Sequence, residues 1–472
     1  MPDNTIPDKR VKALLPWIAA TAFFMQALDS TVLNTALPSI AKDLGYSPLS
    51  MQSVIVSYTI TLALFIPLSG WLSDRYGTST VFRLAVGVFV LGSLACALSR
   101  DLPQLLLARI LQGIGGSMMV PVARLTVLYS YPKKLLMKVM NFIIVPGLVG
   151  AVIGPTLGGW LVELASWQWI FLINLPIGLA GIWIASIGMP QIKKPVGGFD
   201  TLGFILFSGS LGLLTFCLEI ASSGTLHWSY ILLFFVIASL LILMYVYHAR
   251  GKEAPLINLN LFRIRTLRVG LMGNLATRLG IGGFPMVLPL MLQVGFGYSP
   301  SIAGMILIPV AAANLLAKSM VVPIIKRFGH KRTLIANTIL LALIQTLFAF
   351  LSADTPIFWL VILLLVYGTF SSLQFTSMNT ITMADLDENN SSAANSMIAI
   401  TQQLSFSFGV SIAGFLLLNM QQWLPDNWGA TATFRVTFIL LAVLTALSAL
   451  VFRKLHVSDG ARLSGYRPEL RE

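Results

Sequence analysis

Residues 229–248 read SYILLFFVIASLLILMYVYH, twenty positions without an acidic residue, a lysine or an arginine. A helix needs about 20 such residues to cross the ~30 Å hydrocarbon layer of a bilayer. The rest of the chain has a similar composition, because 56% of its 472 residues are hydrophobic and only 10% are charged. Soluble proteins carry about 25% charged residues. The composition therefore excludes a set of water-soluble domains and predicts a bundle of membrane-spanning helices.

Thirteen further runs have this character, which predicts an all-α polytopic membrane protein with fourteen transmembrane helices. The fourteen ranges are 14–36, 52–72, 81–98, 104–126, 138–161, 168–189, 200–220, 229–248, 269–293, 301–324, 333–351, 356–383, 391–419 and 432–452. Cys96 and Cys217 both lie in such runs, without a CxxC partner or a second metal ligand nearby. We read them as small buried apolar residues.

The distribution of basic residues predicts the orientation. If both termini are cytoplasmic, 24 of the 31 basic residues fall in inner segments, while the outer segments hold only Lys42 and Arg100, with Arg435 near a helix end. This asymmetry is the positive-inside bias of multi-pass proteins. We therefore expect a multi-pass membrane protein with both termini in the cytoplasm, with the bilayer, not nucleic acid, as the partner of its net charge of +13.

The order of the runs suggests two bundles joined by an inserted pair of helices. We expect a six-helix bundle at 1–189, a linker with two additional helices and an interfacial amphipathic helix at 190–268, a second six-helix bundle at 269–452, and a cytoplasmic tail at 453–472. Pseudo-symmetric halves with a site between them near the midplane are typical of secondary transporters.

The sequence lacks the motifs of ATP-driven and metal-dependent chemistry. Gly251-Lys252 is followed by Glu253, so no GxxxxGK[ST] loop is formed, and no HExxH or paired CxxC occurs. We therefore expect no cofactor, no metal and no catalytic residues. Ionisable residues inside the predicted spans remain, each costing about 2.5 to 3.5 kcal/mol on insertion scales, so that they mark functional positions.

Asp29 is the only acid well inside a predicted helix of the first bundle. At 1.5 Å per residue, Asp29 lies about 10 Å and Arg109 about 8 Å from the outer ends of their helices, which is a similar depth. A nearby cation keeps a carboxylate ionised, and loss of that cation favours proton uptake. We interpret the two as a proton-coupling pair; the alternative is a static ion pair that joins two helices.

The second bundle carries two cations without an acid in a neighbouring predicted span. Asn274 precedes Arg278 by four residues, and Asn314 precedes Lys318 by four, which places each amide on the face of its cation in a continuous helix. An anionic substrate would satisfy such cations. Alternatively, Lys318 extends to the interface and Arg278 bonds backbone carbonyls or polar neighbours. Those neighbours are Gln374, Asn379, Gln402 and Gln403.

Several stretches resemble motifs of one known family, taken in chain order. Ala27-Leu28-Asp29-Ser30-Thr31-Val32-Leu33-Asn34-Thr35-Ala36-Leu37-Pro38 lies in the first span, and Gly70-Trp71-Leu72-Ser73-Asp74-Arg75-Tyr76-Gly77 follows the second. Arg109-Ile110-Leu111-Gln112-Gly113 is an RxxQG sequence, and 167–178 read WQWIFLINLPIG. The fifth span carries Gly147, Gly150, Gly154, Pro155, Gly158 and Gly159. Together they resemble the major facilitator superfamily, and specifically its fourteen-helix drug:proton antiporter branch.

The resemblance implies roles for particular residues. It assigns Arg109 to proton coupling, and it places Asp74 and Arg75 in an inner charge network that locks one state of the transport cycle. Thr78 and Ser79 replace the basic pair usual in that loop, which implies a weaker lock. The residues that it makes gating elements are Gly70, Asp74, Arg75, Gly77, Gly154, Pro155, Gly158 and Gly159.

These observations predict a monomeric proton-coupled exporter in which a proton neutralises Asp29 and substrate binds between the bundles. The expected substrate-facing residues are Asn34, Arg109, Gln112, Asn274, Arg278, Asn314, Lys318 and Gln374. Two kinds of substrate remain open: amphiphilic drugs, which the family implies, and a small carboxylate such as citrate, free or metal-complexed, which the buried cations favour. The alternatives to a transporter are a membrane sensor and a channel. The sequence shows no large soluble domain that would support a sensor, and the glycines of the fifth span argue for a transporter that changes conformation and against a channel.

Overall fold

The computed structural model describes residues 9–223, 228–252, 255–386, 391–425, 430–461 and 466, and all regular structure in these ranges is helical. The chain divides into two compact units. The first comprises Met1–Phe199 with Ser299–Met305, and the second comprises Asp200–Tyr298 with Ile306–Glu472.

All fourteen predicted runs lie on helices of the described residues. Within the described residues, eleven spans are long and apolar enough to cross a membrane. A pair bent by 51°, Pro300–Leu316 with Lys318–Phe348, raises the number to twelve if it counts as one span. The helix that carries the first predicted run, α1, is not among these spans of the described residues. The bent pair contains two of the predicted runs, which meet at a kink where Gly329 has φ 74°.

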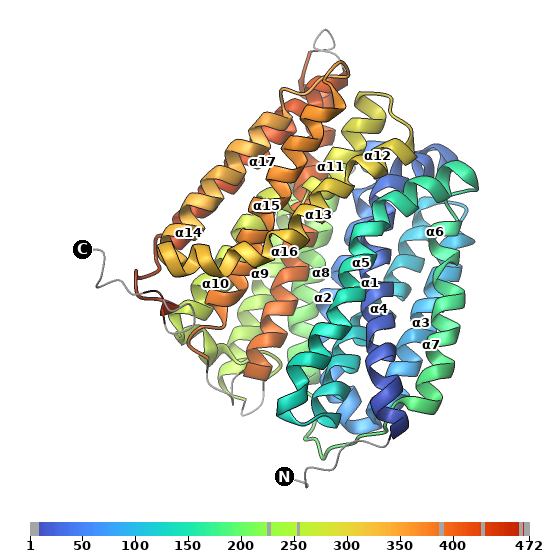
Figure 1. Ribbon diagram of the computed structural model, residues 1–472, viewed down its shortest axis with the longest axis vertical. Coiled ribbons are helices and arrows are strands. Elements are labelled where there is room, and N and C mark those ends of the chain that lie inside the picture. The colour runs from blue at the N-terminus through green and yellow to red at the C-terminus, as the bar shows by residue number, and fades with distance from the viewer. Residues whose placement is uncertain are drawn as a thin grey trace. The chain divides into compact units, whose positions relative to one another are not determined.

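The first unit is built around α1 and α4. Its elements are α1 (Lys9–Leu44), η1 (Pro48–Ser50), α2 (Gln52–Tyr76), α3 (Thr78–Ala97), α4 (Leu102–Ser130), α5 (Lys133–Leu164), α6 (Trp169–Leu172), α7 (Asn174–Gly188) and most of α12 (Pro300–Ile306). α1 runs beside α5, and α4 contacts α1, α2 and α3 (Figure 1). A core of apolar side chains, including Leu15, Phe82, Phe89 and Val122, fills the space between them.

Glycines of α5 allow α1 to approach its backbone. A Cβ at Gly150 would lie 2.8 Å from the carbonyl oxygen of Phe24, and a Cβ at Gly158 would overlap the carbonyl oxygen of Val32. Small residues allow this kind of close helix approach in membranes. The hydroxyl of Thr35 donates to the carbonyl oxygen of Pro155 at 2.9 Å, which further joins the two helices.

The second unit contains the remaining helices. They are α8 (Thr201–Ser223), α9 (Trp228–Arg250), η2 (Leu259–Arg263), α10 (Arg265–Ile281), α11 (Phe284–Leu290), η3 (Met291–Gly295), α13 (Ile308–Leu316), α14 (Lys318–Phe348), α15 (Ile357–Thr382), α16 (Ser391–Trp423) and α17 (Ala430–Phe452). Four aromatic rings stack in its core, with Phe284 against Tyr367 at 3.8 Å and Phe348 against Phe438 at 5.7 Å between centroids. α10 contacts α15, α16 and α17, and so occupies the centre of this unit.

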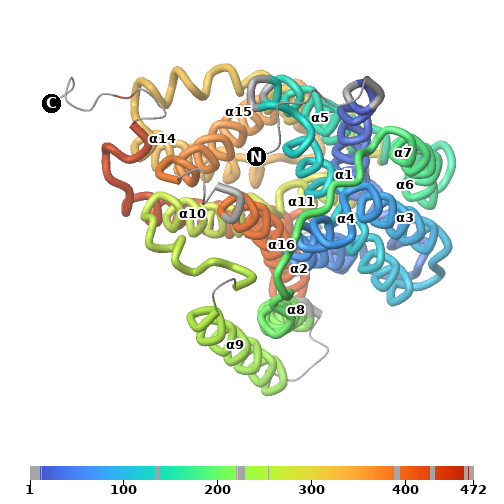
Figure 2. Tube along the Cα trace, turned by 90° about the horizontal axis from the view of Figure 1, so that it is seen from below, coloured from blue at the N-terminus to red at the C-terminus, as the bar shows by residue number. Residues whose placement is uncertain are grey.

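The inserted pair, α8 and α9, belongs to the second unit. α8 contacts α16, whereas α9 contacts α8 and η2 and is buried over only 11% of its apolar span (Figure 2). The stretch after α9, which was expected to be an amphipathic helix, does not form an α-helix: between 255 and 264 the described chain contains only the five-residue 3₁₀ helix η2. Pro255 lacks the backbone N–H that a continuing helix needs, and Leu261 is buried against Leu267 and Met397 instead of facing the interface.

Candidate functional site

The side chains of Asp29 and Arg109 form a buried ion pair in the first unit. Arg109 Nη1 donates to Asp29 Oδ2 at 2.9 Å, and both side chains are about 1% exposed. The similar depth of the two residues predicted this proximity. The other acids on the described helices of this unit, Asp43, Asp74 and Glu163, lie within two residues of a helix end, so Asp29 is the acid placed deepest along a helix.

Hydrogen bonds and an aromatic ring fix the position of the Arg109 side chain. Its Nε donates to the backbone carbonyl of Val54 at 3.2 Å, and Nη1 also donates to Gln112 Oε1 at 2.6 Å. The guanidinium lies 4.2 Å from the centroid of the Tyr58 ring, a cation–π distance. The buried charge is therefore balanced by a carboxylate, two oxygens of amide groups and an aromatic face.

The second oxygen of Asp29 is also occupied. Gln112 Nε2 donates to Asp29 Oδ1 at 2.7 Å and to Ser93 Oγ at 2.8 Å, and Asn174 Nδ2 donates to Asp29 Oδ1 at 3.3 Å. These contacts join α1, α3, α4 and α7 in one network. Because every oxygen of the carboxylate has a donor, any change in its protonation must alter bonds to several helices.

Two glycines allow the helices to bring these groups together. A Cβ at Gly92 would lie 2.5 Å from the backbone nitrogen of Gln112, and a Cβ at Gly113 would lie 2.8 Å from Cβ of Thr61. α3 and α2 therefore approach the backbone of α4 at the level of Arg109 and Gln112. Larger residues at these positions would separate the members of the network.

The expected gating loop after α2 is bound by the segment that follows α7. Asp74 accepts a hydrogen bond from the Tyr129 hydroxyl at 3.2 Å, and its backbone carbonyl accepts from Lys194 N at 2.9 Å. Arg75 is exposed and lies over the ring of Trp71 at 4.9 Å. Gly77 has φ 97°, and a Cβ there would overlap the side chain of Gln191. A Cβ added at Gly70 would meet no other described atom within 4 Å.

Thr78, which stands where the related loop has a basic residue, contacts the same segment. Its backbone N–H donates to Ile192 O at 3.1 Å and its hydroxyl donates to Pro190 O at 2.7 Å. The expected gating glycines of α5 contact other helices: Gly154 and Gly158 face α1, and a Cβ at Gly159 would overlap the backbone of Pro300 in α12.

In the second unit, Arg278 of α10 lies in a polar patch without an acidic partner in the described residues. Its Nε donates to Asn274 Oδ1 at 2.8 Å, and its guanidinium lies 4.8 Å from the Phe375 ring centroid. Asn379 Oδ1 accepts from Gln402 Nε2 at 2.9 Å and from Asn274 Nδ2 at 3.5 Å. The two terminal nitrogens of Arg278 have no hydrogen-bond acceptor in the described part of the chain, and the side chain is half-buried.

Three other residues that were expected to face substrate, Gln374, Asn314 and Lys318, have different surroundings. Gln374 is fully buried and bonds Asn337 and Thr338, at 2.7 and 2.8 Å. The backbone carbonyl of Asn314 accepts from Ser372 at 2.7 Å. Lys318 is exposed and begins α14 after the bend, so the continuous helix that would align it with Asn314 is absent. In the first unit, Asn34 is 3% exposed, and its Oδ1 has no hydrogen-bond donor among the residues that the structure describes.

A family model described as the Major Facilitator Superfamily matches residues 19–410 and 270–470. The chain belongs to this superfamily. It is 45% identical over 442 residues to the "Putative multidrug resistance protein MdtD" of Pectobacterium atrosepticum, an alignment that covers 93% of this chain and 94% of that protein. The protein of the same name from Klebsiella pneumoniae is 43% identical, with 93% of each chain covered.

Solved structures show the same superfamily fold at low sequence identity. An auto-inhibited peptide transporter of the POT family matches with a TM-score of 0.69 and 15% identity, covering 98% of this chain and 99% of that one. A D-xylose–proton symporter matches with a TM-score of 0.66 and 14% identity, covering 94% and 98%. The match to the superfamily model and to the curated relatives shows that the protein is a multi-span membrane transporter and not an enzyme.

The sequence missed several members of both polar groups. Ser93, Asn174 and Tyr58 join the Asp29 network, and Phe375 faces Arg278. Each stands in a run of apolar residues, where a lone serine, asparagine or tyrosine is inconspicuous. Asn174 had a signal, because it lies inside the 167–178 motif that carried the resemblance to the superfamily.

Proposed function

We propose that this superfamily transporter is a proton-coupled exporter of small organic molecules in the bacterial inner membrane, with both termini cytoplasmic and an alternating-access cycle. One observation carries the proposal: the buried carboxylate of Asp29 holds Arg109, Gln112 and Asn174 at once. Asp29 is the proton-carrying group, and Arg109 is its positioning partner.

The coupling follows from the cost of an unpaired buried charge. When Asp29 takes a proton, Arg109 remains charged, because a guanidinium does not deprotonate in proteins. Removal of one partner from a buried ion pair costs about 3–5 kcal/mol. Arg109 must then find other acceptors, and α1 and α4 lose their direct electrostatic link. Protonation therefore favours a different arrangement of these helices, which is what a proton-driven cycle requires.

The alternative is that Asp29 and Arg109 form a static ion pair that only stabilises the bundle. The hydrogen bonds from Gln112 and Asn174 to Asp29 support that alternative as well, because bonds between four helices also make a structural link. The two accounts differ in one outcome: a static pair predicts proton-linked transport that survives neutralisation of Asp29.

Two substrate classes have support. The name of the relatives, which describes them as multidrug resistance proteins, favours a set of drugs. The patch around Arg278 favours a small organic anion such as citrate, free or bound to a metal ion. The terminal guanidinium nitrogens of Arg278 have no acceptor in the described residues. A guanidinium also presents paired donors that match the two oxygens of a carboxylate. Asn274 and Phe375 would fix the orientation of that fork.

The test is substrate-induced proton flux in liposomes that contain the purified protein. Citrate and a lipophilic cation are compared for the wild type, Arg278→Ala and the control Arg268→Ala, an exposed arginine on the same helix. Citrate-driven flux that is lost only in Arg278→Ala supports an anion exporter. Flux with the cation alone, equal in all three proteins, supports drug export and makes Arg278 structural. Flux with neither substrate contradicts the proposed export of both classes.

A further inference from the structure

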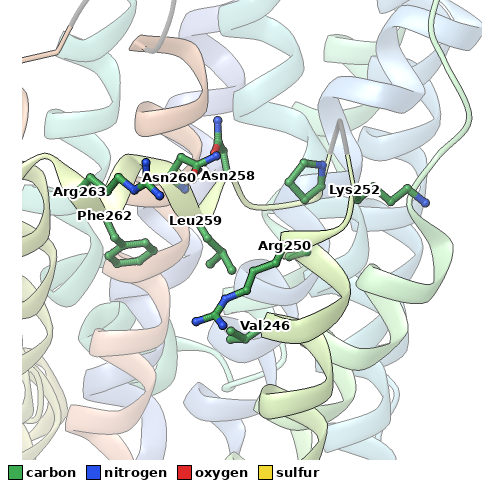
Figure 3. Close-up of a pocket in the computed structure, with 10 residues that line it drawn as sticks. Val246, Arg250, Lys252, Asn258, Leu259, Asn260, Phe262 and Arg263 are labelled. Atoms are coloured by element: carbon green, nitrogen blue, oxygen red, sulfur yellow. Dashed lines mark hydrogen bonds between the residues drawn. The ribbon is translucent and has the colours of Figure 1, made fainter.

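A basic pocket at the end of α9 is unused by the transport site. It has a volume of about 610 Å³ and lies between the last turn of α9 and η2 (Figure 3). Its lining combines cations, amides and apolar groups, among them Val246, Arg250, Asn258, Leu259, Phe262 and Arg263. All of these residues belong to the second unit.

Bonds from Asp200 and Tyr245 fix the chain segment that forms one wall of the pocket. Asp200 accepts from Leu256 N at 3.3 Å, from His248 Nε2 at 2.7 Å and forms an ion pair with Lys252 at 3.3 Å. The Tyr245 hydroxyl accepts from Ile257 N at 2.9 Å. The path of the chain from Pro255 to Asn258 is therefore held by buried groups, and the pocket is a built feature of the fold.

Two of its three cations have no bonding partner within the described residues. Lys252 is paired with Asp200 and extends to the side opposite Arg250 in Figure 3. Arg250 extends toward the side of the pocket formed by Leu259 and Phe262, and neither Arg250 nor Arg263 has a hydrogen bond or an ion pair within the described residues. Residues 253–254 lie outside that part of the chain. Two open guanidinium groups with the amides of Asn258 and Asn260 are suited to phosphate oxygens.

The position of the pocket identifies the source of the phosphate. Ser229–Arg250 spans 22 residues, or about 33 Å at 1.5 Å per residue, so that its end reaches the headgroup layer of a bilayer. α9 is exposed over most of its length, including Leu240, Leu243 and Tyr247. An apolar exposed helix face that leads to an open basic pocket matches a molecule with acyl chains and an anionic headgroup.

We propose that this pocket binds the phosphate headgroup of an anionic phospholipid, whose acyl chains lie along the exposed face of α9. The bound lipid anchors the inserted pair α8 and α9 to the bilayer at the level of Arg250. Val246, Leu259 and Phe262 contact the glycerol and the first methylenes, while Arg250 and Arg263 bind the phosphate.

The test uses the full-length protein in an uncharged detergent, with bound lipid counted by native mass spectrometry. Phosphatidylglycerol and phosphatidylcholine with identical acyl chains are titrated separately. Each cation near an anionic headgroup contributes about 1 kcal/mol, so Arg250→Gln/Arg263→Gln should reduce the preference for phosphatidylglycerol by about 30-fold and each single substitution by about fivefold. The single variants keep the test open if the double variant does not fold.

The control is Arg453→Gln/Lys454→Gln, which removes the same charge from two exposed cations outside the pocket. An unchanged preference in this control, with a loss in the pocket variants, supports the site. An equal loss in both double variants overturns it in favour of diffuse attraction, and no loss in the pocket variants overturns it outright. A second arm adds inorganic phosphate: full displacement of phosphatidylglycerol at equimolar concentration would identify a soluble phosphate ligand and overturn the lipid assignment.

Discussion

Replacement of Asp29 by asparagine should destabilise the first unit through the buried charge that it leaves behind. The wild-type carboxylate accepts from Arg109 at 2.9 Å and from Gln112 at 2.7 Å. In Asp29→Asn, one side-chain oxygen can still accept from Gln112, but the new amide nitrogen faces Arg109 Nη1, donor against donor. Loss of one partner of a buried pair costs about 3–5 kcal/mol, and we expect that reduction in the free energy of unfolding.

Removal of the other partner should cost less and should depend on pH. In Arg109→Gln the carboxylate that has lost its partner can take up a proton and become neutral, whereas a guanidinium that has lost its partner cannot release its proton. The cost of this substitution should therefore fall on acidification, by up to about 1.4 kcal/mol for each pH unit, over the range in which Asp29 is protonated in the folded variant and ionised in the unfolded chain. Asp29→Asn/Arg109→Gln leaves two neutral amides, and its cost should be about 3 kcal/mol less than the sum of the single costs.

The assay is reversible unfolding in mixed micelles by a denaturing detergent, at several pH values, for the wild type, both single variants and the double variant. Asp354→Asn, an exposed acid in the turn between α14 and α15, is the control and should change little. If the costs of the two single substitutions add up to the cost of the double substitution within about 0.5 kcal/mol, the pair is not coupled. A cost for Arg109→Gln that is constant with pH would refute the claim that Asp29 can take a proton when its partner leaves.

Three further outcomes follow from the structure. Gly92→Ala should cost about 1–3 kcal/mol of stability, because its Cβ would lie 2.5 Å from Gln112 N, whereas Gly87→Ala, with no atom within 4 Å, should cost little in the same unfolding assay. Arg278→Lys keeps the charge but loses the bond to Asn274, and should raise the KM for an anionic substrate about tenfold with little change in kcat. Burial alone would raise the pKa of Asp200, but hydrogen bonds from His248, Gly203, Lys252 and Leu256 outweigh it and lower that pKa. The stability that Asp200 contributes should thus be complete above its unfolded pKa of about 3.9 and be lost as pH falls through the lower folded value, so the unfolding difference between wild type and Asp200→Asn should shrink below about pH 4.

The sequence predicted the helices and the main ion pair because both follow from local rules. A run of about 20 apolar residues must form a helix in a bilayer, since its backbone groups have no other partner there. Asp29 and Arg109 were predictable because each is a costly charge at a similar depth. Depth and helix phase are properties of one helix at a time, and a single sequence contains them.

Contacts that depend on the path of the chain between helices were not predictable. The segment after α9 was expected to be helical from its apolar spacing, but Asp200 and Tyr245, 56 and 12 residues away from the backbone N–H groups that they bind, hold it in another path. The bend before Lys318 removed the alignment with Asn314 for a similar reason, since spacing rules assume a continuous helix. Neutral members of the Asp29 network, such as Ser93, carry no charge that would mark them in the sequence.

The central claim is that Asp29 carries the coupled proton, and proton movement in liposomes tests it most directly. Protein is reconstituted with an internal pH indicator, and citrate or a lipophilic cation, whichever drives flux in the wild type, is added to the wild type, Asp29→Asn and the control Asp354→Asn. We predict that substrate-driven proton flux is retained in Asp354→Asn and abolished in Asp29→Asn, while the folded protein still binds substrate. Proton flux of wild-type size in Asp29→Asn would contradict the account and leave the buried pair as a structural link between α1 and α4.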